Sequence, residues 1–314
     1  MIVSRFWKAL SKTPAPAFKT IRFFLLLMIP ISLGVLLLDK SGILLWFIRF
    51  AAPLMGFLGL PGEAALVFLT SVFLNLYSAI AVIETLDLQV RDIIILAALC
   101  AIAHNLLIEC AILKKAGSFF PRIVLIRVLS GIAAAWVLNR ILPPALVLEE
   151  AVIILPGAIG IDFRELPSIL QEWFINSLFL AIRVSLIIFA VIFLQKLMEE
   201  FGVIKILGKA MTPLMRLFGL SANAGYIWIV ANVIGLIYGS AALIEEIRSG
   251  QLSPQEADLL NHHVAISHSQ LGENFLFMAV GVHFFWVALP RLFMALIVVW
   301  LTKGCRTLFT ALSR

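Results

Sequence analysis

The sequence predicts an all-α polytopic membrane protein that consists of two inverted repeats of about five helical segments each. Two observations carry this prediction. The first is composition: 62% of the residues are hydrophobic, 13% are charged, and the mean hydropathy is +1.07. A soluble domain cannot bury so much apolar surface, and several apolar stretches are long enough to cross a bilayer. The second observation is that the chain contains a diverged copy of itself.

The internal repeat is visible as short motifs that recur in the same order. Pro-Leu-Met followed by Gly-Leu begins at Pro53 and again at Pro213, a shift of 160 residues. His-x4-Glu occupies 104–109 and 268–273, a shift of 164, and Pro-Arg begins at 121 and 290, a shift of 169. A shift that grows slowly indicates an old duplication with small loop insertions. Two related halves of a membrane protein commonly enclose a solute pathway at their interface.

The apolar segments divide the chain into a first repeat (1–142), a linker (143–168) and a second repeat (169–314). The predicted segments are 22–38, 43–59, 63–83, 93–113 and 120–142, and then 171–196, 203–218, 222–245, 257–280 and 282–302. The linker is apolar but interrupted by Pro143-Pro144 and Pro156-Gly157, which favours a surface segment over a span.

The first segment follows a basic N-terminus that resembles a signal peptide. No cleavage site of small residues follows Leu38, so we expect a retained helix. The second segment of each repeat is short for a span. Each of these short segments could instead form a re-entrant hairpin with the segment that follows it.

An odd number of segments per repeat means that the two repeats cross the membrane in opposite directions. With the N-terminus inside, Lys and Arg collect on the inner side and the acidic loop residues on the outer side. We therefore expect a bacterial-type inner-membrane protein with both termini in the cytoplasm. Because topology explains the net charge of +6, nucleic acid is not an expected partner.

The sequence lacks the motifs that are typical of several functional classes of protein. The three cysteines form no spaced pair, and Gly202 to Gly208-Lys209 has the wrong spacing for a phosphate-binding loop. We see no nucleophile–base pair, so the protein is not expected to be an enzyme or to carry a cofactor. An energy source would be an ion gradient, with H⁺ or Na⁺ as coupling ion, or a separate protein.

The fourth segment of the second repeat carries the strongest polar cluster. At about 100° per residue, Ser269 and Glu273 share one helix face, and Gln270 and Asn274 form a second pair. His268 lies about 140° from Glu273 on an intact helix, so these two could share a ligand only if the helix unwinds. Gly272 is placed to allow this.

The first repeat has a weaker version of the same cluster. It contains His104, Asn105 and Glu109 but lacks the glycine. The third segments add Asn223 and Asn232 in the second repeat. Ionisable groups within spans usually face a cavity or a partner. These side chains predict a solute site, while a seam of interhelical hydrogen bonds without a ligand stays the alternative.

A metal site is the competing interpretation of the histidines. Imidazole and carboxylate ligands suit divalent iron, zinc or manganese, which would use His268 and His104. His262 and His263 lie near a helix start, where a solvated role is commoner. Arg183 lies within a span and needs a counter-charge, for which Glu109 and Glu273 are the candidates.

The paired pattern of Pro-Leu-Met…Gly-Leu and His-x4-Glu resembles the nucleoside recognition (Gate) domain membrane proteins. That group is related to concentrative nucleoside transporters and to the membrane region of the ferrous-iron transport protein B. The resemblance covers about 50–140 and 210–302, one Gate unit per repeat. In transporters of this lineage, hairpin tips and unwound helices hold the solute. By matching position, the resemblance implicates Asn223, Asn232, Ser269, Gln270, Glu273 and Asn274.

We therefore expect a transporter of a small polar solute, such as a nucleoside, that works by alternating access between the repeats. Glu273 would be the ligand or proton-coupling carboxylate, and Glu109 its pseudo-symmetric partner. A divalent-cation permease is the first alternative and a non-transporting scaffold or accessory subunit the second. The lipid bilayer is an expected partner, and a homo-oligomer or a partner membrane protein stays open.

Overall fold

The computed structural model describes residues 2–143 and 166–312, and every regular element in these ranges is a helix. Within these ranges, five helical stretches are long and apolar enough to cross a membrane, among them Val90–Lys115 and Phe284–Leu308. The predicted all-α polytopic membrane architecture is confirmed. Most of the expected linker, 144–165, lies outside the described residues, and its last three positions already belong to a helix.

The first repeat begins with an amphipathic helix and ends with a long apolar one. Its helices are α1 (Ile2–Lys12), α2 (Pro14–Lys40), α3 (Ile43–Phe57), α4 (Ala64–Phe73), α5 (Leu76–Ile83), α6 (Val90–Ala103), α7 (Leu106–Lys115) and α8 (Phe120–Ile141).

The second repeat follows the same plan. Its helices are α9 (Leu166–Glu200), α10 (Val203–Ala210), α11 (Thr212–Leu217), η1 (Ala222–Ala224), α12 (Gly225–Val233), α13 (Leu236–Arg248), α14 (Pro254–Ser267), α15 (Gln270–Phe277), η2 (Met278–Val280) and α16 (Phe284–Leu312).

The third segment of each repeat is a helical hairpin and not a span. Helix α4 packs back against α5, and α12 packs back against α13. The first tip turns at Asn75, whose side chain caps α5 by accepting from Ser78 N–H at 3.0 Å. The second turns at Gly235, whose φ of 133° disfavours other residues. The re-entrant hairpins thus lie within the third segments, one segment later than the sequence suggested for the short second segments.

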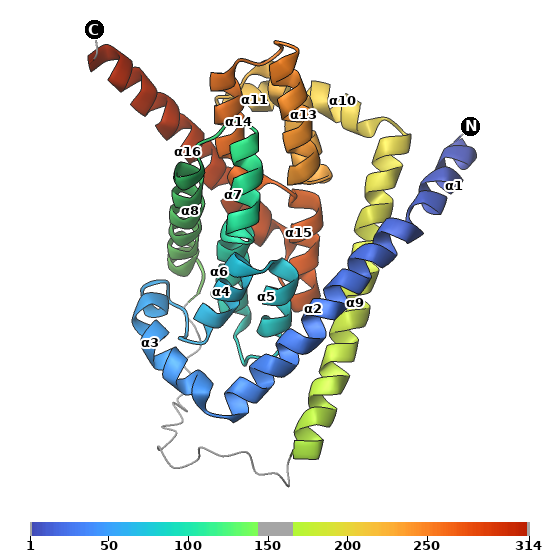
Figure 1. The fold of residues 1–314 in the computed structure, drawn as a ribbon, viewed down its shortest axis with the longest axis vertical. Helices are drawn as coiled ribbons and strands as arrows, with labels where there is room; N and C mark the ends of the chain where they lie inside the picture. The colour runs from blue at the N-terminus through green and yellow to red at the C-terminus, as the bar shows by residue number, and fades with distance from the viewer. Residues whose placement is uncertain (1, 144–165, 313–314) are drawn as a thin grey trace.

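The two repeats run in opposite directions (Figure 1). In this view the interrupted helix α6–α7 runs upward, and its counterpart α14–α15 runs downward. Helix α3 lies at the bottom and α10–α11 at the top, while the N- and C-terminal ends both lie at the top. The hairpin of each repeat returns to the side from which it came, and the short second segments, α3 and α10–α11, lie at the ends of the molecule. Each repeat therefore keeps three crossings, which are α2, α6–α7 and α8 in the first and α9, α14–α15 and α16 in the second. This preserves the inverted relation.

The cores of the two repeats are interlocked. One buried cluster surrounds the first hairpin and α6, and it includes Leu276 and Phe277 at the end of α15. The other surrounds the second hairpin and α14, and it includes Leu106, Cys110 and Leu113 of α7. The second half of each interrupted helix therefore packs in the core of the other repeat, which brings the two interruptions together at the centre.

Candidate functional site

The interruptions in the fourth segments have the same backbone conformation in both repeats. His104 and His268 are extended, with ψ of 161° and 163°. Asn105 and Ser269 then adopt the left-handed conformation, with φ of 43° and 54°. Such residues redirect the chain and end a right-handed helix. The two joints are related by the same shift of 164 residues that relates the His-x4-Glu motifs.

Each joint is held by the neighbouring hairpin. Asn105 donates its backbone N–H to the carbonyl of Ser71 at 2.7 Å, and Ser269 donates its own to the carbonyl of Ala231 at 2.9 Å. The expected unwinding at Gly272 was wrong: this glycine lies inside α15. The helix α6–α7 of the first repeat is also interrupted, although it has no glycine at the equivalent position. The interruption is tolerated because the Ser71 carbonyl of the hairpin accepts the Asn105 N–H that leaves the helix.

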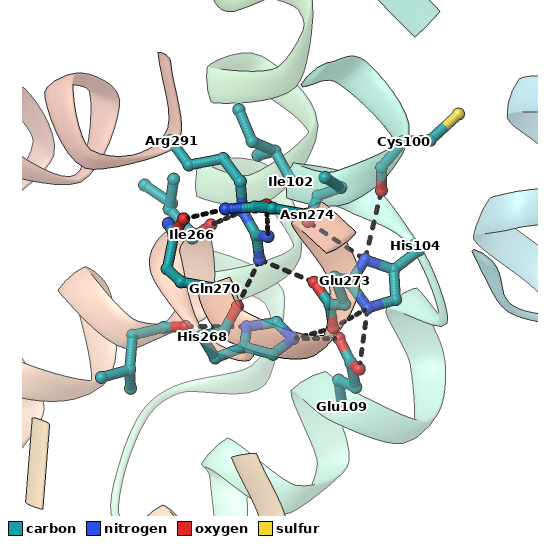
Figure 2. A network of polar contacts seen from close by, with 12 residues as sticks. Cys100, Ile102, His104, Glu109, Ile266, His268, Gln270, Glu273, Asn274 and Arg291 are labelled. Carbon is teal, nitrogen blue, oxygen red and sulfur yellow. Dashed lines mark hydrogen bonds and ion pairs between the residues drawn. The ribbon is translucent and has the colours of Figure 1, made fainter. Parts of the chain in front are cut away.

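The breaks bring four side chains together, and we call His104, Glu109, His268 and Glu273 the His–Glu centre (Figure 2). The Nε2 atom of His104 lies 3.1 Å from Glu109 Oε1 and 3.1 Å from Glu273 Oε1. The Nε2 atom of His268 lies 3.2 Å from Glu109 Oε2 and 3.7 Å from Glu273 Oε1. The 140° that would separate His268 from Glu273 on an intact helix no longer applies. Each repeat supplies one histidine and one glutamate.

A buried arginine holds each carboxylate. Arg127 Nη2 lies 2.7 Å from Glu109 Oε2, and Arg291 Nη2 lies 2.8 Å from Glu273 Oε2. Both arginine side chains are fully buried. Each also donates to carbonyls at the end of its interrupted helix: Arg127 to Ile102 and His104, Arg291 to Ile266 and His268. Two largely buried carboxylates thus face two buried guanidinium groups, as charges in a low-dielectric interior require.

Sequence reasoning missed these arginines as a pair. It matched Arg291 with Arg122 through the Pro-Arg motif, but Arg122 instead binds Asp258, with Nη2–Oδ1 of 2.7 Å. The true counterpart of Arg291 is Arg127, because the two make equivalent contacts and differ by 164 positions. The signal was present in the sequence, since this shift equals that of the His-x4-Glu motifs.

Two predicted amides support the centre in the second repeat. Asn274 Oδ1 accepts from Arg291 Nη1 at 3.1 Å, and Asn274 Nδ2 donates to Gln270 Oε1 at 2.5 Å. Asn274 is fully buried, so it positions the arginine and does not face the cavity. The first repeat has Cys110 and Leu106 at the equivalent positions.

Of the other residues predicted to bind the solute, two line the cavity beside the centre and two lie away from it. Ser269 and Asn105 lie at the joints and line the cavity described next. Asn232 is buried in α12, where its side chain donates to the carbonyl of Trp228 at 2.8 Å. Asn223 is exposed and donates to the carbonyl of Gln251, so the structure does not bring it to the centre.

A cavity of about 610 Å³ opens next to the His–Glu centre. Its wall is formed by the two hairpin tips, both joints, and parts of α2 and α9. Three members of the centre line it: His104, Glu109 and Glu273. Asn75, Tyr77 and Gln195 add further polar groups. The volume is in the range of small-molecule sites.

Two expectations about charged and basic side chains were wrong. His262 and His263 are completely buried and not solvated. His263 packs against Phe218 and accepts from Trp228 Nε1 at 3.2 Å, since the hydrophobic core encloses this part of α14. The counter-charge of Arg183 is Glu84, with Nη2–Oε1 of 3.4 Å, and neither carboxylate of the His–Glu centre.

Comparison with known proteins supports the membrane architecture without assigning a substrate. No protein-family model matches the chain, so the resemblance to the Gate domain proteins is not confirmed, and no solved structure matches it. The chain is similar to YvoD of Bacillus subtilis (strain 168), described as an uncharacterized membrane protein. The two are 26% identical over 253 residues, which is 81% of this chain and 80% of that protein. A match of this length extends into both repeats. Together with the apolar helices, the similarity to a membrane protein supports a multi-pass membrane protein.

Proposed function

We propose that the protein is a transporter, rather than an enzyme or a scaffold, and that it moves a small polar solute by alternating access between its two inverted repeats. One observation carries the proposal. Two hairpins and two interrupted helices, contributed equally by the repeats, meet at one buried charged centre beside a cavity of about 610 Å³. We place it in a bacterial-type inner membrane with both termini in the cytoplasm.

The interrupted backbone supports this proposal physically. In the hydrocarbon region, a chain that leaves helical geometry must find partners in protein or line a water-filled cavity. Inverted-repeat transporters use such discontinuous helices to form a site near the bilayer midplane. Here the joints at Asn105 and Ser269 line the cavity. The histidine of each repeat directly precedes its joint, and the glutamate lies four residues after it. A purely structural seam would have no need of a cavity at this point.

The hairpins are suited to act as gates. Each contacts the joint of its own repeat through one backbone hydrogen bond, from Asn105 to Ser71 and from Ser269 to Ala231. A further bond joins Gln195 Nε2 to the carbonyl of Val233 at 2.6 Å. The first hairpin is reached from the end of the molecule near α3 and the second from the end near α10 (Figure 1). Withdrawal of one tip would open the cavity to one side while the other tip keeps it closed.

Binding and uptake together test the proposal. A thermal-shift panel with nucleosides, nucleobases, Na⁺, Mn²⁺, Fe²⁺ and Zn²⁺ identifies ligands of the folded protein, because such ligands raise Tm. Those ligands are then offered to proteoliposomes under a proton or a sodium gradient. We expect uptake by the wild type and by Glu245→Gln, a matched control at an exposed position of α13. Glu273→Gln should abolish it.

The test includes a readout of alternating access that does not depend on the solute. In a background without Cys100, Cys110 and Cys305, Ser269→Cys should react with an impermeant maleimide from either side of the membrane. A ligand that locks one state should suppress labelling from one side. Full uptake by Glu273→Gln, or labelling restricted to one side under all conditions, would contradict the proposal.

A further inference from the structure

The His–Glu centre has the arrangement of a cation-binding site. Four nitrogen–oxygen separations, of 3.1, 3.1, 3.2 and 3.7 Å, connect the two imidazole Nε2 atoms to the two carboxylates. The ligating atoms of His104, Glu109 and His268 all lie within 4.8 Å of one another. The four residues come from two interrupted helices, α6–α7 and α14–α15, one from each repeat. The cluster therefore forms only in the folded protein.

The hydrogen bonds of the histidines fix which nitrogen faces the carboxylates. His104 Nδ1 lies 3.1 Å from the carbonyl of Ala101, and His268 Nδ1 lies 2.8 Å from that of Val264. A carbonyl can only accept, so each Nδ1 carries the hydrogen and donates it. In the neutral ring, Nε2 then presents a lone pair to carboxylate oxygens, which also only accept. A cation between the Nε2 atoms and the carboxylate oxygens would interact favourably with both kinds of acceptor. Histidines that bind metals commonly donate their other N–H to a backbone carbonyl in this way.

We infer that His104, His268, Glu109 and Glu273 form a binding site for a divalent transition-metal cation. Metal–ligand bonds of about 2.0–2.2 Å in a tetrahedral site place neighbouring ligand atoms about 3.3–3.6 Å apart. The four nitrogen–oxygen separations bracket this range, and the ligating atoms of His104, Glu109 and His268 lie within 4.8 Å of one another, so side-chain rotation without a change of fold would bring them to one ion. Two imidazoles with two carboxylates suit zinc, ferrous iron or manganese, whereas magnesium and calcium prefer oxygen ligands.

The arginines adapt the site to a cation that must leave again. Arg127 and Arg291 engage the Oε2 atoms of the two glutamates, which leaves Glu109 Oε1 and Glu273 Oε1 directed toward His104. The guanidinium charges weaken the attraction for a cation relative to carboxylates without partners. Because His104, Glu109 and Glu273 line the cavity, a cation can reach the site from there. The identification of this cation as the transported solute rests on the proposed function, while the site itself does not.

Metal binding to the purified full-length protein is the direct test. We expect isothermal titration with Zn²⁺ and with Mn²⁺ to show one saturable site per chain. X-ray absorption of the zinc-loaded protein should show nitrogen and oxygen ligands at about 2.0–2.2 Å and no sulfur. His104→Ala, His268→Ala and Glu109→Gln should lose this binding at concentrations that saturate the wild type. His283→Ala, which removes an exposed histidine, should retain it.

The variants must remain folded for the result to count. His268→Gln keeps an uncharged polar side chain of similar size, so it serves where His268→Ala aggregates in size-exclusion chromatography. Absence of a saturable site in the folded wild type would overturn the inference. Binding that is unchanged in the His104 and His268 variants would overturn it too, because other ligands would then hold the metal.

A flux measurement separates this inference from the proposed function. Proteoliposomes that contain a zinc-sensitive dye report entry of Zn²⁺. Binding with flux supports both ideas. Binding without flux of any solute supports the site and overturns the transporter. Flux of another solute without metal binding supports the transporter and overturns the metal site.

Discussion

The two halves of the His–Glu centre share their charges but differ in what surrounds them. In the second repeat, Arg291 is fixed by Glu273, by two carbonyls and by Asn274 Oδ1. In the first, Arg127 has the carboxylate and the two carbonyls, but its Nη1 meets no nitrogen or oxygen acceptor among the described residues. The residue in the place of Asn274 is Cys110, and a thiol is a weak acceptor.

Burial does not explain this difference. The Glu109 side chain is 12% exposed and that of Glu273 is 15% exposed, while both arginines are at 0%. The duplication has therefore kept the charge pairs, which the membrane interior enforces, and has let the neutral support diverge. The second half of the centre is held more rigidly than the first, and this makes the first half the better candidate for the part that adjusts when a ligand binds.

Removal of the arginines should have the largest effect. Arg291→Ala and Arg127→Ala each leave a buried carboxylate without its partner, which costs about 3–5 kcal/mol of unfolding free energy. We expect the larger loss for Arg291→Ala because it also releases Asn274. Unfolding in detergent, followed by tryptophan fluorescence, measures both.

Two variants control that comparison. Arg216→Ala removes an exposed arginine and should change stability little. Glu273→Gln combined with Arg291→Ala should recover part of the loss, since the unpaired charge is gone. Equal losses for both arginine variants would contradict the proposed asymmetry.

Exchange of Asn274 and Cys110 tests the asymmetry itself. Asn274→Cys removes a hydrogen bond to a charged group and should cost about 1.5–3 kcal/mol. Cys110→Asn gives Arg127 an acceptor at the equivalent place and should stabilise the protein by about 1 kcal/mol. Both are measured by the same unfolding assay. Destabilisation by Cys110→Asn would mean that the first half has no room for the amide.

The hairpins can be compared through Gly239. A Cβ at this position would lie 2.5 Å from the Cβ of Ala231 across the second hairpin, whereas the first hairpin has Ala79 at the position shifted by 160. Gly239→Ala should therefore cost about 1–3 kcal/mol. Gly34→Ala is the control, since nothing lies within 4 Å of its added Cβ. Equal melting temperatures for the two variants would refute the tight packing.

The smallest effect is expected at the left-handed joints. Glycine adopts this conformation without strain, and asparagine tolerates it better than serine. Ser269→Gly should raise the unfolding free energy by up to about 1 kcal/mol, and Asn105→Gly should change it less. A larger gain for Asn105→Gly, in the same assay, would show that the first joint is the more strained one.

Much of the fold could be predicted from local patterns. Apolar length and composition predicted the all-α membrane architecture and ten segments whose outer limits resemble those of the helices, and the repeated motifs predicted the duplication. The polar residues in the fourth segments also pointed to the part of the chain that contributes the His–Glu centre. These features depend on neighbouring residues and on the hydrophobic effect, which a sequence displays directly.

The hairpins, the joints and the arginine–glutamate pairs could not be predicted from residues that are close in the chain. Asn105 leaves the helix because the carbonyl of Ser71 accepts its N–H, and Ser71 belongs to another segment. Arg127 meets Glu109 because α8 packs beside α7.

By itself, then, the sequence determined a duplicated helical membrane protein with polar groups in its fourth segments. The tertiary structure decided that two histidines and two glutamates from different repeats share one centre. The physical reason is that helix formation is decided by residues close in the chain, whereas the satisfaction of buried backbone groups and charges depends on partners that only packing brings near.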